Sequence, residues 1–195
     1  AGGRTAVVCA PPGAGKSSRI PLWLLDADWR GDSKILLLEP RRVAARALAR
    51  YAARLLGEDV GGLVGYRMRQ ESAVSAATRL EVVTEGVLTR LLQQDPALPG
   101  VCCILFDEFH ERSLQADLGL ALSLESRALL RPDLRLVAMS ATLDADGVAA
   151  LLGNCPTLRC EGQSYPVETR YLPPPPDAAG MPALLRHTAA VIRRA

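Results

Sequence analysis

Aromatic, lysine and histidine side chains are scarce in this chain. Aromatic residues make up 4% of its 195 residues, and only two histidines occur, His110 and His187. So few aromatics argue against the base-stacking platform that many single-strand binders use. No apolar run approaches the roughly 18 residues needed to cross a bilayer, so we expect no membrane partner and a cytoplasmic setting.

The cysteines are irregular in number and in spacing. There are five of them, and none shows a C-x-x-C or cysteine/histidine spacing of the zinc type. Cys9, Cys102 and Cys103 fall inside apolar runs, where a reduced thiol behaves as a small hydrophobic side chain. We therefore expect reduced core cysteines and no zinc site.

Positive charge is carried almost entirely by arginine. Lys16 and Lys34 are the only lysines among the 23 basic residues, and the formal net charge is +2. A GC-rich genome also explains the arginine bias. The net charge is too small to indicate a nucleic-acid partner by itself, so such a partner has to be argued from where the charges lie.

Short apolar runs alternate with longer amphipathic segments. The runs predicted to be strands are 6–10, 35–39, 80–84, 102–107 and 134–140. Helices are expected after Gly15 and over 43–56, 85–93, 114–130 and 144–152. This alternation is typical of successive βαβ units and predicts an α/β fold, a mainly parallel sheet flanked by helices on both faces.

A proline run separates this part of the chain from a short tail. Residues 173–176 are four consecutive prolines, which neither a helix interior nor a central strand accommodates. Residues 181–195 have a helical pattern but no cap to end it. We interpret 171–180 as a linker and the tail as the first piece of a neighbouring domain, so the chain is expected to be a fragment.

A candidate phosphate loop lies at the N-terminus. The stretch APPGAGKSSR (10–19) carries the end of the G-x-x-x-x-G-K-[ST] pattern as Gly15, Lys16 and Ser17, with Ala10 in place of the first glycine. Ala10 closes the predicted strand, so it need not adopt the loop conformation that demands glycine. Backbone N–H groups at the following helix start would face phosphates, with Lys16 on the β- and γ-phosphates and Ser17 beside Mg²⁺. The alternative is a chance glycine-rich turn.

Two adjacent carboxylates follow a second apolar strand. In CCILFDEFHER (102–112), Asp107 and Glu108 come at the strand end, where ligands of open parallel sheets bind. An aspartate there can hold Mg²⁺ through water, and the neighbouring glutamate can orient or deprotonate an attacking water. His110 lies beside them. The alternative is an ordinary acidic turn, which the upstream phosphate loop makes the weaker interpretation.

Arginine pairs occur in two further segments. Arg41 and Arg42 stand at a strand-to-helix turn on the same sheet edge, where guanidinium groups suit phosphate oxygens. Arg67 and Arg69 are two residues apart and share a face if the segment is extended. Solvated surface arginines are the alternative for both pairs. Contact to phosphate and sugar would be sequence-tolerant and salt-sensitive, and nothing in the pattern separates RNA from DNA.

Six segments, in order, resemble motifs of the DEAH-box helicases of superfamily 2. They are APPGAGKS (10–17), EPRRVAAR (39–46), GYRMRQES (65–72), TEGVL (84–88), DEFHER (107–112) and SATLD (140–144). The resemblance covers about residues 1 to 172 and looks most like the bacterial HrpB-type branch. In that branch the third letter of DEAH is replaced, here by Phe109.

The resemblance implies a first RecA-like P-loop NTPase domain at 1–172, and at 173–195 a linker with the start of a truncated second one. It implies an ATP-dependent RNA helicase that uses ATP or another NTP with Mg²⁺. Its partners would be single-stranded or partly duplex RNA and the missing second RecA-like domain. The fragment alone would bind nucleotide but hydrolyse it poorly.

The same resemblance implies a role for each motif position. The nucleotide-binding set is Pro12, Gly13, Ala14, Gly15, Lys16, Ser17 and Ser18. The metal set is Ser17 and Asp107, the catalytic set is Glu108, Lys16 and His110, and the coupling set is His110, Ser140 and Thr142. The nucleic-acid set is Arg41, Arg42, Arg67, Arg69, Thr84, Glu85 and Gly86. The alternatives are a P-loop NTPase that does not translocate, a DNA-directed helicase, and a binding module without catalysis.

Overall fold

The computed structural model describes residues 3–141, 145–161, 168–169, 171–173 and 180–193. Contacts divide the chain into two units, residues 1–162 and residues 163–195. The second unit contains one helix among its described residues, α6 (Met181–Ile192), in which no residue is buried. Its assignment to a second RecA-like domain stays a prediction.

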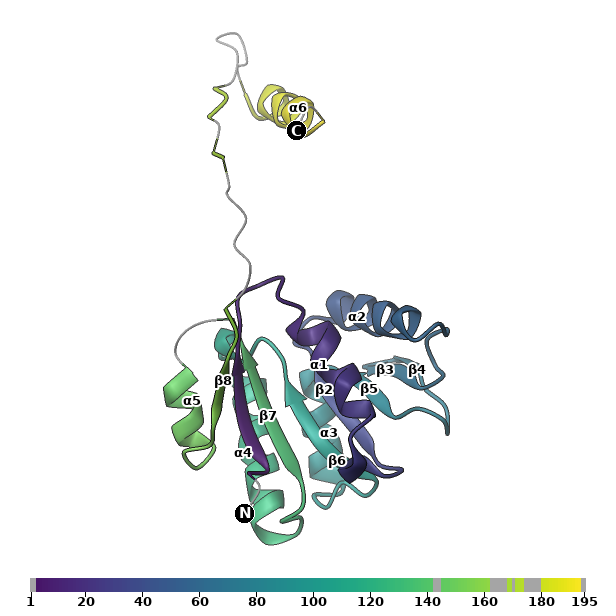
Figure 1. Ribbon diagram of the computed structural model, residues 1–195. Coiled ribbons are helices and arrows are strands. Elements are labelled where there is room, and N and C mark those ends of the chain that lie inside the picture. Colours follow the sequence, from purple (N-terminus) through teal and green to yellow (C-terminus); the bar gives the residue numbers. More distant parts are fainter. Residues whose placement is uncertain (1–2, 142–144, 162–167, 170, 174–179, 194–195) are drawn as a thin grey trace. The chain divides into compact units, whose positions relative to one another are not determined.

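The described part of the first unit contains a single sheet of eight strands in the order β4-β3-β5-β2-β6-β7-β1-β8 (Figure 1). The strands are β1 (Thr5–Cys9), β2 (Lys34–Leu38), β3 (Val64–Met68), β4 (Glu71–Ala73), β5 (Leu80–Val83), β6 (Val101–Phe106), β7 (Arg135–Ser140) and β8 (Thr157–Arg159). All pairings are parallel except the antiparallel hairpin of β3 and β4. The loops after β1, β2, β5, β6 and β7 therefore leave the sheet at one edge.

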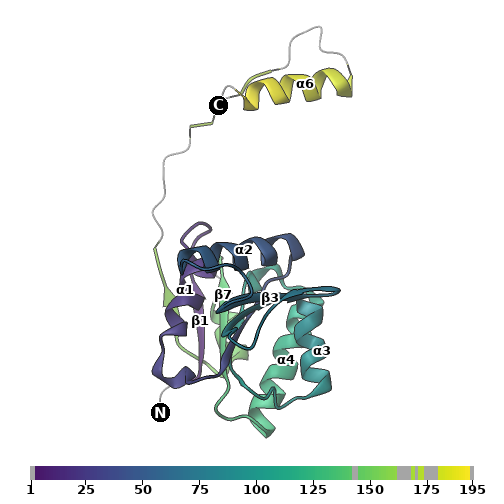
Figure 2. The ribbon, with the colours of Figure 1, turned by 90° about the vertical axis from the view of Figure 1, so that its right-hand side faces the viewer.

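Helices cover both faces of this sheet. They are α1 (Lys16–Leu25), α2 (Arg42–Leu55), α3 (Glu85–Gln94), α4 (Leu114–Leu129) and α5 (Ala145–Leu151). Buried side chains of α1 and α2 form one core cluster, and those of α3, α4 and α5 form another. Figure 2 shows α1 on the opposite side of the sheet from α3 and α4. None of the helices in the described part of the chain has the length and hydropathy needed to traverse a bilayer.

The strand sequences explain the two-sided core. All six residues of β6 and four of the five in β2 are buried, as continuous apolar runs require when helices lie on both faces. On α2 the side chains facing the sheet are alanines, including Ala45 and Ala49 one turn apart, which lets the helix approach the strands closely. Cys9, Cys102 and Cys103 are buried, as expected for core thiols.

The predicted fold class is confirmed, and the five predicted strands correspond to β1, β2, β5, β6 and β7. Strands β3, β4 and β8 were not predicted. β3 contains Gly65 and Arg67, and β8 is only three residues long and largely exposed, so neither shows an apolar run. Gly65 lies so close to β4 that a Cβ there would sit 2.4 Å from the carbonyl oxygen of Ala73.

Candidate functional site

The glycine-rich loop connects β1 to α1 at the carboxyl edge of the sheet. Ala10 continues the ladder of β1, since its N–H donates to the Ser140 carbonyl at 3.1 Å, as expected for a residue that closes the strand. Gly13 and Gly15 then adopt φ values of 79° and 81°, a left-handed region that favours glycine. Helix α1 begins at Lys16, so its first N–H groups open onto this loop.

Lys16 turns back into the loop and is not a surface cation. The residue is only 6% exposed. Its Nζ donates to the carbonyl oxygens of Ala10 at 2.5 Å and Pro11 at 3.1 Å. An ammonium group is thus held at the carboxyl end of β1, next to the N-terminus of a helix. The ammonium charge and the partial positive charge of the helix N-terminus both attract anions.

Asp107 lies on the same edge, directly after β6. It is 4% exposed, its N–H donates to the Leu38 carbonyl at 2.9 Å, and its Oδ1 accepts the Glu108 N–H at 2.9 Å. Burial raises the pKa of Asp107, and the charge of Glu108 adds to the rise, while the nearby Ser17 hydroxyl and the Lys16 ammonium oppose it. The loop and the strand-end carboxylate are therefore brought together, as the sequence predicted.

The residues present fit a magnesium ion. Within the described part of the chain, Oδ2 of Asp107 is buried without a hydrogen-bond partner, and the Ser17 hydroxyl is close to that carboxyl. Oxygen ligands of this kind are those that Mg²⁺ prefers, and the remaining ligands are normally phosphate and water. No group of three or more histidine, cysteine or acidic residues that could hold a metal occurs among the described residues.

Glu39 is a third carboxyl group at this edge, and the sequence analysis did not assign it. It follows β2, is 6% exposed, and accepts the Arg41 N–H through Oε1 at 3.2 Å. Burial raises its pKa to about 7, and the negative charges of Asp107 and Glu108 add to the rise. An acidic residue directly after an apolar strand was the available signal, the same signal that identified Asp107.

Glu108 and His110 lie in the tight turn between β6 and α4. Glu108 has φ 48° and ψ 33°, a left-handed conformation that is uncommon for a residue with a side chain, and it begins the short 3₁₀ helix Phe109–Glu111. The His110 Nδ1 accepts the Ala141 N–H at 3.3 Å and lies 3.4 Å from Oε2 of Glu108. His110 therefore contacts the strand end that carries Ser140. Thr142, the other predicted coupling residue, lies outside the described residues.

Phe109 anchors this turn in the core. It is 1% exposed and packs edge-on against Phe106, with ring centroids 6.0 Å apart and an interplanar angle of 77°. The guanidinium of Arg112 lies 5.5 Å above the same ring. Aromatic pairs and cation–π contacts each stabilise the folded chain beyond the contribution of the buried apolar surface. The side chain at the third motif position thus fixes the segment that carries Glu108 and His110.

The predicted nucleic-acid residues lie around the other strand ends. Arg41 pairs with Glu111 at 2.5 Å, and Arg42 donates to the Arg69 carbonyl at 3.4 Å. Thr84 precedes α3 in an extended conformation and makes no side-chain cap, while Glu85 accepts a hydrogen bond from the Ser113 hydroxyl at 2.5 Å. Several of these groups are therefore already engaged within the domain.

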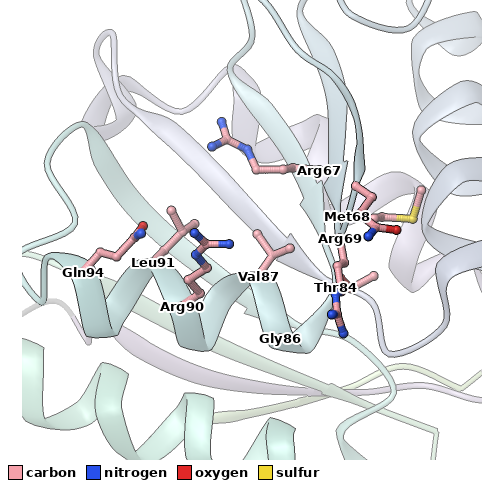
Figure 3. Close-up of a pocket in the computed structure, with 10 residues that line it drawn as sticks. Arg67, Met68, Arg69, Thr84, Gly86, Val87, Arg90, Leu91 and Gln94 are labelled. Carbon is pink, nitrogen blue, oxygen red and sulfur yellow. The ribbon is translucent and has the colours of Figure 1, made fainter.

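A groove of about 750 Å³ lies between the β3–β4 hairpin and α3 (Figure 3). Its lining consists of Arg67, Met68, Arg69, Gln70, Thr84, Gly86, Val87, Arg90, Leu91 and Gln94. Four of the predicted nucleic-acid residues, Arg67, Arg69, Thr84 and Gly86, are among them. The sequence analysis missed Arg90 and Gln94, since polar residues on an amphipathic helix usually indicate no more than a solvated face.

Comparisons with known proteins identify the family of the chain. The family model for the DEAD/DEAH box helicase matches residues 1–151. The chain is 53% identical over 188 residues to the ATP-dependent RNA helicase HrpB of Escherichia coli, covering 96% of this chain and 23% of that protein. It is 41% identical over 179 residues to the ATP-dependent RNA helicase DHX29 of Mus musculus, covering 87% of this chain and 13% of that protein.

Solved structures give the same result. A crystal structure of the Escherichia coli DEAH/RHA helicase HrpB superimposes with a TM-score of 0.85 at 52% identity, covering 99% of this chain and 24% of that one. A second, of the E. coli DExH-box NTPase HrpB, gives a TM-score of 0.79. The chain spans about a quarter of the length of this relative. This chain belongs to the DEAD/DEAH box helicase family, and its mainly parallel sheet with the flanking helices forms the RecA-like helicase domain of that family.

Proposed function

We propose that this chain is the nucleotide-binding core of an ATP-dependent RNA helicase, which couples hydrolysis of Mg²⁺–ATP or another NTP to movement along RNA or to its unwinding. The observation that carries the proposal is the meeting of Lys16 with Asp107 at the carboxyl edge of the sheet. A buried ammonium, a helix N-terminus and a buried carboxylate with an unpartnered oxygen lie together there. The relatives named above are RNA helicases, and this supports the same substrate here.

In this proposal the chain binds the triphosphate through Lys16 and the backbone N–H groups of residues 12–18. Ser17 and Asp107 hold Mg²⁺, which neutralises charge on the phosphate oxygens when it is bound. Glu108 orients the attacking water and accepts its proton. The left-handed backbone of Glu108, fixed by the buried ring beside it, supports a positioned catalytic group.

His110, Ser140 and Thr142 are proposed to couple the nucleotide site to the nucleic-acid surface and to a second RecA-like domain. The Ala141 N–H bond to His110 supports this role, because it joins the ends of β6 and β7. The second domain is proposed to supply an arginine to the transition state. Residues 1–195 alone are therefore expected to bind nucleotide and to hydrolyse it poorly. Because ATP and RNA meet in the bacterial cytoplasm, we propose that location.

Two alternatives make different predictions. A P-loop NTPase that does not translocate would use Lys16, Ser17 and Asp107 in the same way, but it would not need Arg67 and Arg69 beside Thr84. A DNA-directed helicase would keep all of these groups. A binding module without catalysis would not need Glu108.

Steady-state ATP hydrolysis separates these alternatives. The rate is measured for residues 1–195 and for the longer protein, each without nucleic acid, with single-stranded RNA and with single-stranded DNA. We expect that only the longer protein, which includes the second RecA-like domain, hydrolyses ATP at an appreciable rate. RNA should stimulate this rate, and Glu108→Gln should lower it roughly 10²-fold or more. Stimulation by DNA only would indicate the DNA-directed alternative, and indifference to both would indicate the non-translocating one. Turnover unchanged by Glu108→Gln would remove the catalytic role of that residue.

A further inference from the structure

One ion pair joins a predicted nucleic-acid residue to the turn that carries Glu108. Arg41, at the start of α2, donates through Nη2 to Oε1 of Glu111 at 2.5 Å. Glu111 is the last residue of the 3₁₀ helix that begins after Glu108. The strands before these two segments, β2 and β6, are parallel neighbours, so their loops leave the sheet side by side. The pair therefore bridges two adjacent loops at the carboxyl edge.

Both partners of this pair can be reached from solvent. The Arg41 side chain is 69% exposed, and the Glu111 side chain is 36% exposed. Exposed ion pairs contribute little to stability, because water solvates the separated charges well. A phosphate group is a strong partner for the guanidinium, since it accepts two parallel N–H bonds. Exchange of Glu111 for a phosphate therefore costs little.

Glu111 and Glu108 are the two ends of one hydrogen-bonded turn. The Glu111 N–H donates to the Glu108 carbonyl at 2.9 Å. The left-handed conformation of Glu108 persists only where surrounding contacts fix it. The buried ring of Phe109 is one such contact, and the Arg41 pair at the far end of the turn is another. Loss of the pair therefore removes one restraint on the segment that positions the Glu108 carboxylate.

The same segment contacts a second nucleic-acid region. Ser113 follows the turn, and its hydroxyl donates to Oε1 of Glu85 at 2.5 Å. Glu85 is the first residue of α3 and comes directly after Thr84. Residues 108–113 thus contact predicted nucleic-acid residues that follow two different strands, β2 and β5. A change on the nucleic-acid surface has two direct contacts through which it reaches this segment.

We propose that Glu111 is a positioning residue that holds Arg41 until a nucleic-acid phosphate takes its place, and that this exchange links RNA binding to the Glu108 turn. Arg41 then has two states, paired with Glu111 or with a phosphate, and RNA favours the second. The inference rests on the proposed function, because the phosphate belongs to the RNA of that proposal. It gives Glu111, to which the sequence analysis assigned no role, an effect that opposes RNA binding.

The first test is equilibrium binding of a fluorescein-labelled single-stranded RNA to the longer protein, measured by anisotropy. Glu111→Gln releases Arg41, so we expect binding to become about two- to fivefold tighter, the range that breaking an exposed ion pair allows. Asp117→Asn is the matched control. The Asp117 carboxylate is also 36% exposed, but it pairs with Arg112. We expect a smaller gain from this variant.

A double-mutant cycle separates release of Arg41 from the change in net charge. When Glu111→Gln is added to Arg41→Gln, no further gain in affinity is expected, because the guanidinium that it would release is already gone. A gain of the same size in both backgrounds would show that net charge alone is responsible. That result, or equal gains for Glu111→Gln and Asp117→Asn, would overturn the exchange.

Steady-state ATP hydrolysis tests the link to the Glu108 turn. The RNA-free rate of the Glu111→Gln variant should rise about two- to fivefold toward the RNA-stimulated rate, because the variant lacks the restraint that RNA otherwise removes. An RNA-free rate that is unchanged or lower would overturn the link. If the unmodified protein binds no RNA, the proposed function itself is wrong, whereas RNA binding without the expected cycle overturns only the role of Glu111.

Discussion

Replacing Glu39 with glutamine is expected to remove a pH-dependent loss of stability. Burial and the nearby charges of Asp107 and Glu108 raise the pKa of Glu39 from 4.5 to about 7. The folded chain therefore holds this proton between about pH 4.5 and pH 7, whereas the unfolded chain releases it. Since the folded state binds more protons in that window, its stability falls as the pH rises through it.

The size of the effect follows from the pKa. One pKa unit corresponds to about 1.4 kcal/mol, so a rise from 4.5 to about 7 corresponds to about 3 kcal/mol. Glutamine keeps an oxygen that can accept the Arg41 N–H, and it carries no charge to bury. The variant and the unmodified chain should therefore be similar near pH 4.5, with the variant about 3 kcal/mol more stable at pH 8.

Urea unfolding at pH 5, 6, 7 and 8, with EDTA present, measures this difference. For a slope of about 2 kcal/mol per M, the midpoint of Glu39→Gln should exceed that of the unmodified chain by about 1–2 M at pH 8. Glu125→Gln, at an exposed position on α4, is the matched control and should follow the unmodified chain. Parallel stability profiles for Glu39→Gln and the unmodified chain would refute the reasoning.

Three further substitutions test the packing around the site by urea unfolding. Phe109→Ala empties a fully buried position and should cost about 3–5 kcal/mol, so a loss below about 1 kcal/mol would contradict the anchoring role of this ring. Gly65→Ala places a Cβ 2.4 Å from the Ala73 carbonyl oxygen and should cost about 1–3 kcal/mol, with faster hydrogen exchange in the β3–β4 hairpin; unchanged exchange would argue against the clash. Ser113→Ala removes the hydroxyl that accepts the Ala116 N–H at 3.0 Å and should lower the free energy of unfolding by about 1–2 kcal/mol. Ser113→Thr keeps a capping hydroxyl, so an equally large loss in that variant would exclude capping as the cause.

The parallel core of the fold could be predicted because its strands are buried on both faces. Continuous apolar runs such as β6 can be recognised in the sequence, and so can the helices between them. The hairpin of β3 and β4 has no such run, since its position depends on the close approach of Gly65 to the neighbouring backbone. β8 pairs with β1 through only three residues, and a contact so short leaves no periodic signal.

The sequence identified more of the nucleotide site than of the nucleic-acid surface. Lys16 and Asp107 belong to local patterns, and the parallel topology brings the two strand ends to one edge. The raised pKa of Glu39 depends on carboxyl groups almost 70 residues away in the chain, which no local pattern contains. Arg90 lines one groove with Arg67 and Arg69 only in the folded chain, so this arrangement cannot be seen in a linear sequence.

Binding of a fluorescent ATP analogue to residues 1–195, with and without Mg²⁺, tests the central claim most directly. The account predicts saturable binding that Mg²⁺ strengthens in the unmodified chain. Lys16→Ala should abolish binding, and Asp107→Asn should remove most of the dependence on Mg²⁺. Equal affinity in all three proteins, with the same response to Mg²⁺, would show that the nucleotide binds elsewhere and would contradict the account.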